Sequence, residues 1–126
     1  MSGQETEPAY TLEEANAALP DLRERLARIR SSRQQVLRSS ARIREQVAAD
    51  GGGHEGHDYF DALAVLKAEV ENLSERGIIL RDPESGLVDF PAEIEGRRVY
   101  LCWRLGEERV GHWHDLDTGF IGRKPL

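Results

Sequence analysis

The stretch LPDLRERLARIRSSRQQVLRSSARIREQV, residues 19–47, decides the fold. Apolar residues recur in it at alternating spacings of three and four. They are Leu19, Leu22, Leu26, Ile29, Val36, Ile43 and Val47. A 3,4 repeat is typical of a helix that packs along a seam against another helix. Arg33 and Ser40 interrupt the alternate seam positions, so apolar contacts become sparser along the second half.

The helix is expected to begin before this stretch. Thr11-Leu-Glu-Glu14 fits a capping box, in which the Thr11 hydroxyl and the Glu14 carboxylate each accept from the other residue's amide. Pro20 lacks an amide hydrogen, so the helix must kink or restart there. The pattern predicts a long helix over residues 11–49. The part with the 3,4 repeat, about 30 residues, would be roughly 45 Å long.

A second helix is expected after a glycine-rich connector, residues 50–57. Over residues 58–76, Tyr59, Leu63, Leu66, Val70 and Leu73 repeat the 4,3 spacing, and a glycine at position 77 suits the left-handed end of the helix. The two helices should form an antiparallel hairpin. Because the second is shorter, one end of the first should protrude, which favours association of the helices with another chain.

After position 77 the pattern changes from helix to strand. Short apolar runs alternate with turn signals over residues 78–115, and Arg98 to Leu105 has good strand propensity. Residues 116–126 show little periodicity and are expected to form an irregular tail. The predicted fold is therefore α+β: one domain over residues 1–126, with a helical hairpin followed by a three- to four-stranded antiparallel meander.

The hairpin turn sets which face of the sheet carries each side chain. If Gly106-Glu107 is a two-residue turn, Trp103 lies opposite Val110, Leu101 opposite His112 and Val99 opposite His114. Tyr100 then faces Trp113, and Cys102 faces Gly111. A loop longer by one residue would move both histidines to the other face. In either register His112 and His114 project from the same side.

Composition and charge exclude several classes. The chain of 126 residues has a formal net charge of −6, and its basic segment, residues 21–50, has a local net of +4. The arginines of that segment are spread around the helix without aromatic neighbours, so nucleic-acid binding is not expected. A single cysteine, no signal peptide and no long apolar run predict a cytoplasmic protein without a membrane partner.

Motifs along nearly the whole chain resemble the bacterial domain-of-unknown-function family numbered 2203. They are Tyr10-Thr-Leu-Glu-Glu-Ala-Asn16 with Leu19-Pro20 and Leu22, Gly86-Leu-Val-Asp-Phe-Pro91, Tyr100-Leu-Cys-Trp-Arg-Leu-Gly-Glu107, Trp113-His-Asp-Leu-Asp117 and Gly119-Phe-Ile-Gly-Arg123. The resemblance implies a small cytoplasmic prokaryotic protein without an assigned activity, so it transfers no catalytic residues.

Metal binding is one candidate chemistry. His112 and His114, joined by Asp115, Asp117 or Cys102, could hold a divalent transition metal such as zinc. The alternative is that one histidine packs at the sheet edge and the other bonds a carboxylate. His54 and His57 lie in or beside the glycine-rich connector, where a solvated loop is the simpler interpretation. No cofactor is predicted beyond this possible metal.

Two further constellations are open. Cys102 is either a nucleophile with a histidine base or a small buried thiol within a strand. A set of polar residues suits either a small anionic or planar ligand or an ion-pair network that fastens the tail to the sheet. The set comprises Asp89, Arg104, Asp115, Asp117 and Arg123, beside the rings of Tyr100 and Trp113.

The sequence favours a non-enzymatic interaction module that forms a homo-oligomer through its helices, with any other protein partner unknown. The competing hypothesis is a metal- or small-ligand-binding enzyme with a site around His112, His114 and Asp115. Whether the chain is an enzyme stays open at this level.

Overall fold

The computed structural model describes residues 9–50 and 56–126 and confirms the α+β class. The helices are α1 (Leu12–Ala17), α2 (Leu19–Asp50) and α3 (Gly56–Glu75), with a short 3₁₀ helix η2 (Phe120–Gly122). The strands are β1 (Ile79–Asp82), β2 (Leu87–Ile94), β3 (Arg97–Arg104), β4 (His112–His114) and β5 (Lys124–Pro125). They form one antiparallel sheet in the order β1-β2-β3-β4-β5, so the sheet has five strands rather than three or four.

The expected helix over residues 11–49 is divided into α1 and α2 at Ala18. The capping box is present: the Thr11 hydroxyl accepts from the Glu14 amide at 3.0 Å, and the Glu14 carboxylate accepts from the Thr11 amide at 2.9 Å. The division falls two residues before Pro20, which has no amide hydrogen to continue the helical ladder.

The C-terminal end of α3 matches the prediction. Gly77 has a φ of +73°, and the Ile78 amide donates to the Leu73 carbonyl at 3.0 Å. Ile78 is buried, so the left-handed glycine turns the chain from the helix directly into the core. Most of the predicted connector, together with His54 and the side chain of Val47, lies outside the described residues.

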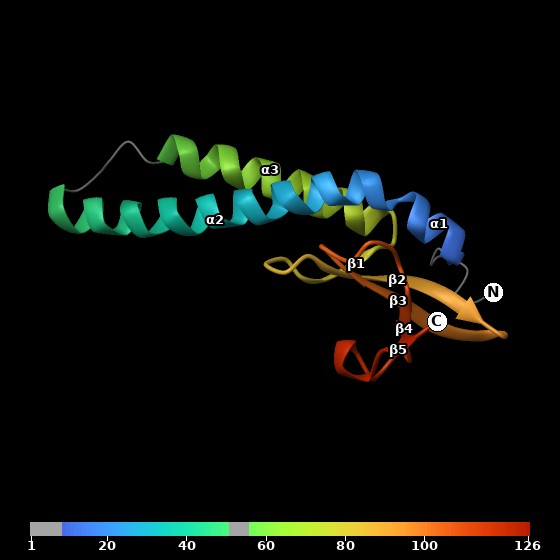
Figure 1. Ribbon diagram of the computed structural model, residues 1–126. Helices are drawn as coiled ribbons and strands as arrows, with labels where there is room; N and C mark the ends of the chain where they lie inside the picture. The colour runs from blue at the N-terminus through green and yellow to red at the C-terminus, as the bar shows by residue number, and fades with distance from the viewer. Residues whose placement is uncertain (1–8, 51–55) are drawn as a thin grey trace, which may run out of the picture.

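The helical hairpin covers one face of the sheet, and the core lies between these two layers (Figure 1). The buried residues of the core come from both layers: Leu19, Leu22, Leu26, Ile29 and Leu73 from the helices, and Val88, Phe90, Val99, Leu101 and Trp103 from the strands. Strand alternation therefore directs the odd-numbered residues of β3 toward the helices, as predicted. In the described part of the chain, no helix is both long and apolar enough to cross a membrane.

The contact between α2 and α3 differs in detail from the predicted seam. On α2 the repeat placed Arg33 and Ser40 at seam positions, but the buried residues are their neighbours Ser32 and Ser39. On α3, Ala62 is buried, while the predicted seam residues Leu63 and Val70 remain 37% and 38% exposed. Small side chains at the contact let the two backbones approach closely, which favours this rotation of the helices.

The predicted pairing of β3 with β4 is wrong by one residue. Tyr100 lies opposite His114, Leu101 opposite Trp113 and Cys102 opposite His112. The connection is longer than the predicted two-residue turn, because β3 ends at Arg104 and β4 begins at His112. Within it, the Glu107 amide donates to the Arg104 carbonyl at 2.9 Å, and Trp103 Nε1 donates to the Glu107 carbonyl at 3.1 Å. The shift by one residue places both histidines on the sheet face turned away from the helices.

Residues 116–126 are more ordered than the predicted irregular tail. They contain η2 and β5, and β5 pairs with β4 so that Lys124 lies opposite Trp113. The Leu126 amide also donates to the Gly111 carbonyl at 2.9 Å. The tail lies on the side of the sheet remote from the helical hairpin (Figure 1).

Candidate functional site

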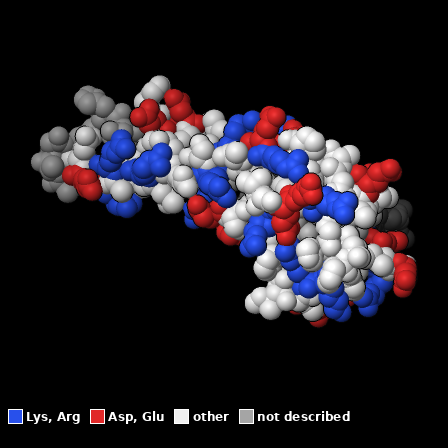
Figure 2. Space-filling model, viewed as in Figure 1, with Lys and Arg blue, Asp and Glu red and all other residues white. Residues whose placement is uncertain are grey.

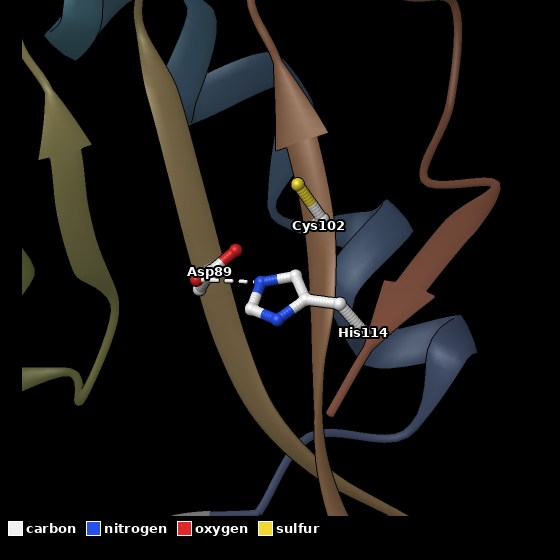
Figure 3. Close-up of side chains that lie close together, drawn as sticks. All are labelled: Asp89, Cys102 and His114. Carbon is white, nitrogen blue, oxygen red and sulfur yellow. Dashed lines mark hydrogen bonds and ion pairs between the residues drawn. The ribbon is translucent and has the colours of Figure 1, made fainter. Parts of the chain in front are cut away.

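Three side chains capable of binding metals meet within the sheet, on the face turned away from the helices. Asp89 comes from β2, Cys102 from β3 and His114 from β4 (Figure 3). In the pairing of β2 with β3, Asp89 lies directly opposite Cys102. In the pairing of β3 with β4, His114 lies opposite Tyr100. Their exposed fractions are 1%, 0% and 2%, so the cluster is fully enclosed by the protein.

Both ring nitrogens of His114 face oxygen acceptors. Nδ1 lies 2.7 Å from the Asp115 carbonyl oxygen, and Nε2 lies 2.9 Å from Asp89 Oδ2. A carbonyl oxygen only accepts, so Nδ1 carries a hydrogen. Without a proton or another cation between them, a lone pair of Nε2 and a lone pair of Oδ2 would then face and repel each other.

Asp89 is held from a second side by Arg81. Arg81 Nε donates to Asp89 Oδ2 at 2.8 Å, and this hydrogen bond raises the pKa of Arg81 above its ordinary value. The Arg81 guanidinium also lies 5.0 Å from the centre of the Tyr100 ring. The other carboxylate oxygen, Oδ1, is buried without a hydrogen-bond partner among the described residues.

Cys102 is a buried thiol in the middle of β3, one of the two alternatives left open by the sequence. Burial, reinforced by the neighbouring Asp89 carboxylate, raises the pKa of Cys102 to about 11, although Arg123 acts in the opposite direction. The thiol is thus protonated at neutral pH. Both nitrogens of His114 are already engaged, so His114 is not free to act as a base toward Cys102.

The predicted site around His112, His114 and Asp115 is not gathered in one place. His112 shares a sheet face with His114 but is half-buried, and it is not in the Asp89–Cys102–His114 cluster. The Asp115 carboxylate pairs with Arg97 at 3.0 Å, and Asp117 is exposed. Only His114 of the predicted metal pair therefore belongs to the enclosed cluster.

Arg104 and Arg123, predicted as ligand-binding residues, meet at Phe120 of the tail. Their guanidinium carbons lie 4.9 Å and 4.3 Å from the centre of the Phe120 ring. Arg123 also forms an ion pair with Glu107 at 2.5 Å. These contacts fasten the tail to the sheet, and whether the same residues also bind a ligand stays a prediction.

The two histidines of the connector region give no metal cluster in the described part of the chain. His57 is exposed on α3 and lies 3.4 Å from Asp61, whereas His54 lies outside the described residues. Arg81 was not predicted as a site residue, and Asp89 was predicted as part of the polar set rather than as a metal ligand. A single carboxylate within the apolar run Leu87-Val-Asp-Phe-Pro91 is the signal that pointed to Asp89.

A family model described as "Uncharacterized conserved protein (DUF2203)" matches residues 9–126. The chain belongs to the DUF2203 family. Comparison with curated proteins gave no match, and neither did comparison with solved structures. The resemblance noted from the sequence motifs is confirmed, and the family brings no reaction or ligand with it.

Several family-like motif residues of this DUF2203 chain join the helices to the sheet. The Tyr10 hydroxyl donates to the Arg76 carbonyl at 2.6 Å, and the Tyr10 amide donates to the Pro91 carbonyl at 2.7 Å. Asn16 Oδ1 accepts from the Val110 amide at 2.8 Å. Motifs near the start of the chain therefore support the architecture around the cluster rather than the cluster itself.

Proposed function

We propose that this DUF2203 chain is a non-enzymatic interaction module that pairs with a second copy of itself through its helices. The surface concerned is the part of the helical hairpin beyond the sheet, residues 35–50 and 56–66, here called the arm. Its boundary is marked by Arg33 and Gln34, which bond the Glu84 carboxylate at 3.2 Å and 3.1 Å in the turn between β1 and β2. Beyond them the hairpin extends past the sheet (Figure 1).

The observation that supports this proposal is the apolar surface of the arm. Leu37 is 54% exposed, Phe60 66%, Leu63 37% and Val65 42%. Scattered exposed apolar residues are ordinary, but these four lie on two adjacent helices with no sheet beneath them. Large exposed apolar side chains on a projecting element are typical of a protein interface.

The two helices of the arm do not cover each other completely. Arg76 pairs with Asp21 at 2.7 Å, and Glu69 pairs with both Arg25 and Arg28 at 2.8 Å, so α3 runs antiparallel along the first part of α2. α2 has 32 residues and α3 has 20, or roughly 48 and 30 Å. The far end of α2 consequently projects past the start of α3 (Figure 1).

Charge favours a second copy as the occupant. Within the arm, residues 35–50 of α2 have three arginines and two acids, whereas residues 56–66 of α3 have two aspartates and neither lysine nor arginine. In Figure 2 the basic side chains of the arm gather over α2 and acidic ones lie on the side of α3. A two-fold pairing would set α2 of each copy against α3 of the other, so the same complementary contact forms twice.

Sedimentation velocity tests the proposal. The unmodified chain is expected to sediment as a dimer at tens of micromolar. The double variant Phe60→Glu/Leu63→Glu should raise the dissociation constant at least about tenfold, because it places charges in an apolar contact.

The control is Ile121→Glu, which adds one glutamate where the double variant adds two, at a residue that is 98% exposed but lies in the tail. This variant should dimerise as the unmodified chain does. A monomer of the unmodified chain at tens of micromolar, or equal weakening by Ile121→Glu, would contradict the proposed surface.

A further inference from the structure

The enclosed cluster beneath the tail contains the three kinds of donor that zinc prefers in proteins. One ligand atom each from Asp89, Cys102 and His114 lies within 4.8 Å of the other two. Thiolate, imidazole and carboxylate all bind zinc, at about 2.0–2.3 Å. A set containing sulfur and nitrogen selects zinc or a similar transition metal over magnesium or calcium, which prefer oxygen.

The hydrogen bonding of His114 presents Nε2 as a ligand. Metal-binding histidines ordinarily donate their other ring hydrogen to a carbonyl or carboxylate, which fixes the tautomer. His114 has this arrangement, because Nδ1 lies 2.7 Å from the Asp115 carbonyl oxygen. Its Nε2 is directed at Asp89 Oδ2, 2.9 Å away, so the two atoms are placed to bind the same cation.

Asp89 and Cys102 provide independent support. Asp89 Oδ1 is buried and lacks a hydrogen-bond partner among the described residues. A buried carboxylate oxygen without a partner is costly and calls for an explanation, which a bound cation would give. Cys102 comes from the strand between Asp89 and His114, and its side chain lies on the same face of the sheet as theirs (Figure 3).

Two arginines occupy the positions of supporting residues. Arg81 Nε donates to Asp89 Oδ2 at 2.8 Å, and Arg123 Nη1 lies 3.9 Å from Cys102 Sγ. Donors of this kind orient metal ligands and stabilise their ionised forms. Zinc with one carboxylate and one thiolate is formally neutral, so it adds no net charge beside the arginines.

We propose that Asp89, Cys102 and His114 bind one zinc ion in place of the proton shared by His114 and Asp89. Binding releases that proton and the thiol proton, and bonds form from zinc to Nε2, to Sγ and to a carboxylate oxygen. The Nε2–Oδ2 separation must widen from 2.9 Å to roughly 3.3 Å, as two bonds of about 2.0 Å at a tetrahedral angle require. The three donors leave the fourth tetrahedral position for water. Because they come from three strands, the ion would crosslink the sheet.

The experiment uses the full chain without a histidine tag. The protein is unfolded in guanidinium with EDTA, freed of chelator, and refolded with zinc or with cobalt(II). Metal content is then measured by mass spectrometry after desalting. Close to stoichiometric zinc and a sulfur-to-cobalt charge-transfer band in the near ultraviolet are expected, together with a higher thermal midpoint than protein refolded with EDTA.

Variants identify the ligands. Cys102→Ser should abolish the charge-transfer band, and Asp89→Asn should weaken metal affinity at least as much as loss of a supporting residue does, about 10–100-fold. His112→Ala is the control, because His112 was the other histidine predicted from sequence and lies outside the cluster. It should retain both the metal and the band.

Three results would overturn the proposal. The first is that the correctly folded, unmodified protein takes up neither zinc nor cobalt, in which case His114 and Asp89 form only a proton-bridged ion pair. The second is cobalt uptake without a sulfur band, which would exclude Cys102 as a ligand. The third is equal metal loss in His112→Ala. The measurements on the unmodified chain decide the matter even if a variant fails to fold, and none of them depends on dimerisation.

Discussion

Asn16 connects two segments that are far apart in sequence. Its side-chain oxygen accepts from the Val110 amide at 2.8 Å, and Val110 is 2% exposed. Asn16→Ala should lower the free energy of unfolding by about 1–3 kcal/mol, because it leaves a buried amide without an acceptor. Chemical denaturation with urea measures this change.

The matched variant is Asn16→Asp, which retains an acceptor oxygen at the same position. It should lose less stability than Asn16→Ala. If the two variants lost the same amount, the hydrogen bond to Val110 would not be the cause.

Gly86 is required for both its backbone conformation and its small size. Its φ is +74°, and an added Cβ would lie 2.7 Å from the Cβ of Leu105. Gly96 has a similar φ of +79° with nothing within 4 Å. Gly86→Ala should therefore destabilise the protein by more than Gly96→Ala, for which the conformational cost alone is about 1–2 kcal/mol. Thermal unfolding of both variants separates the close contact from the backbone conformation.

At the scale of helices, Glu69 fastens α3 to α2 through Arg25 and Arg28, both at 2.8 Å. Burial raises the pKa of Glu69, but the hydrogen bonds from Arg28 and Arg25 outweigh it, and the pKa is lowered from 4.5. A lowered carboxyl pKa contributes stability that is present above the unfolded value and is lost as the pH falls through the folded value.

Glu69→Gln should consequently reduce stability at pH 7 by roughly 1 kcal/mol. The difference from the unmodified chain should shrink as the pH falls below 4.5. Denaturation at a series of pH values checks this. A difference independent of pH would show that the carboxylate charge is not involved.

The helices and most of the strands could be predicted because their determinants are local. The Thr11–Glu14 capping box and Gly77 act within a few residues and appear in the structure, and the helices that the 3,4 repeats predicted are present as α2 and α3. The rotation of α3 could not be predicted in this way. It is seen in the burial of Ser32, Ser39 and Ala62 on the two helices, and a single sequence does not identify which small residues will be buried between helices.

The candidate site was predicted only in part for a related reason. His114 and Cys102 were recognised as chemically capable, but the register of β4 was wrong by one residue. That register depends on contacts within the loop, such as the hydrogen bond from Trp103 to Glu107. Arg81 comes from another strand altogether, so only the assembled sheet brings it to Asp89.

For the whole molecule, the charge distribution predicts how salt affects the proposed dimer. α2 and α3 carry opposite net charges, so raising the salt concentration should weaken pairing between α2 of one copy and α3 of the other. Sedimentation in about 0.1 M and 1 M sodium chloride measures this, since the screening length falls from about 10 Å to 3 Å. Stronger association at high salt would instead indicate a contact governed by apolar surface alone.

The composition of the α2 seam gives the two ends of the molecule different local stabilities. Leu22, Leu26 and Ile29 are completely buried over the sheet, whereas Ser32 and Ser39 occupy the contact farther along. Serine contributes little apolar burial, so the arm should open more readily than the layered part of the protein. Amide hydrogens of the arm should therefore exchange with deuterium while those of β2 and β3 stay protected. The protein would open from the arm toward the sheet, as two units along one continuous helix.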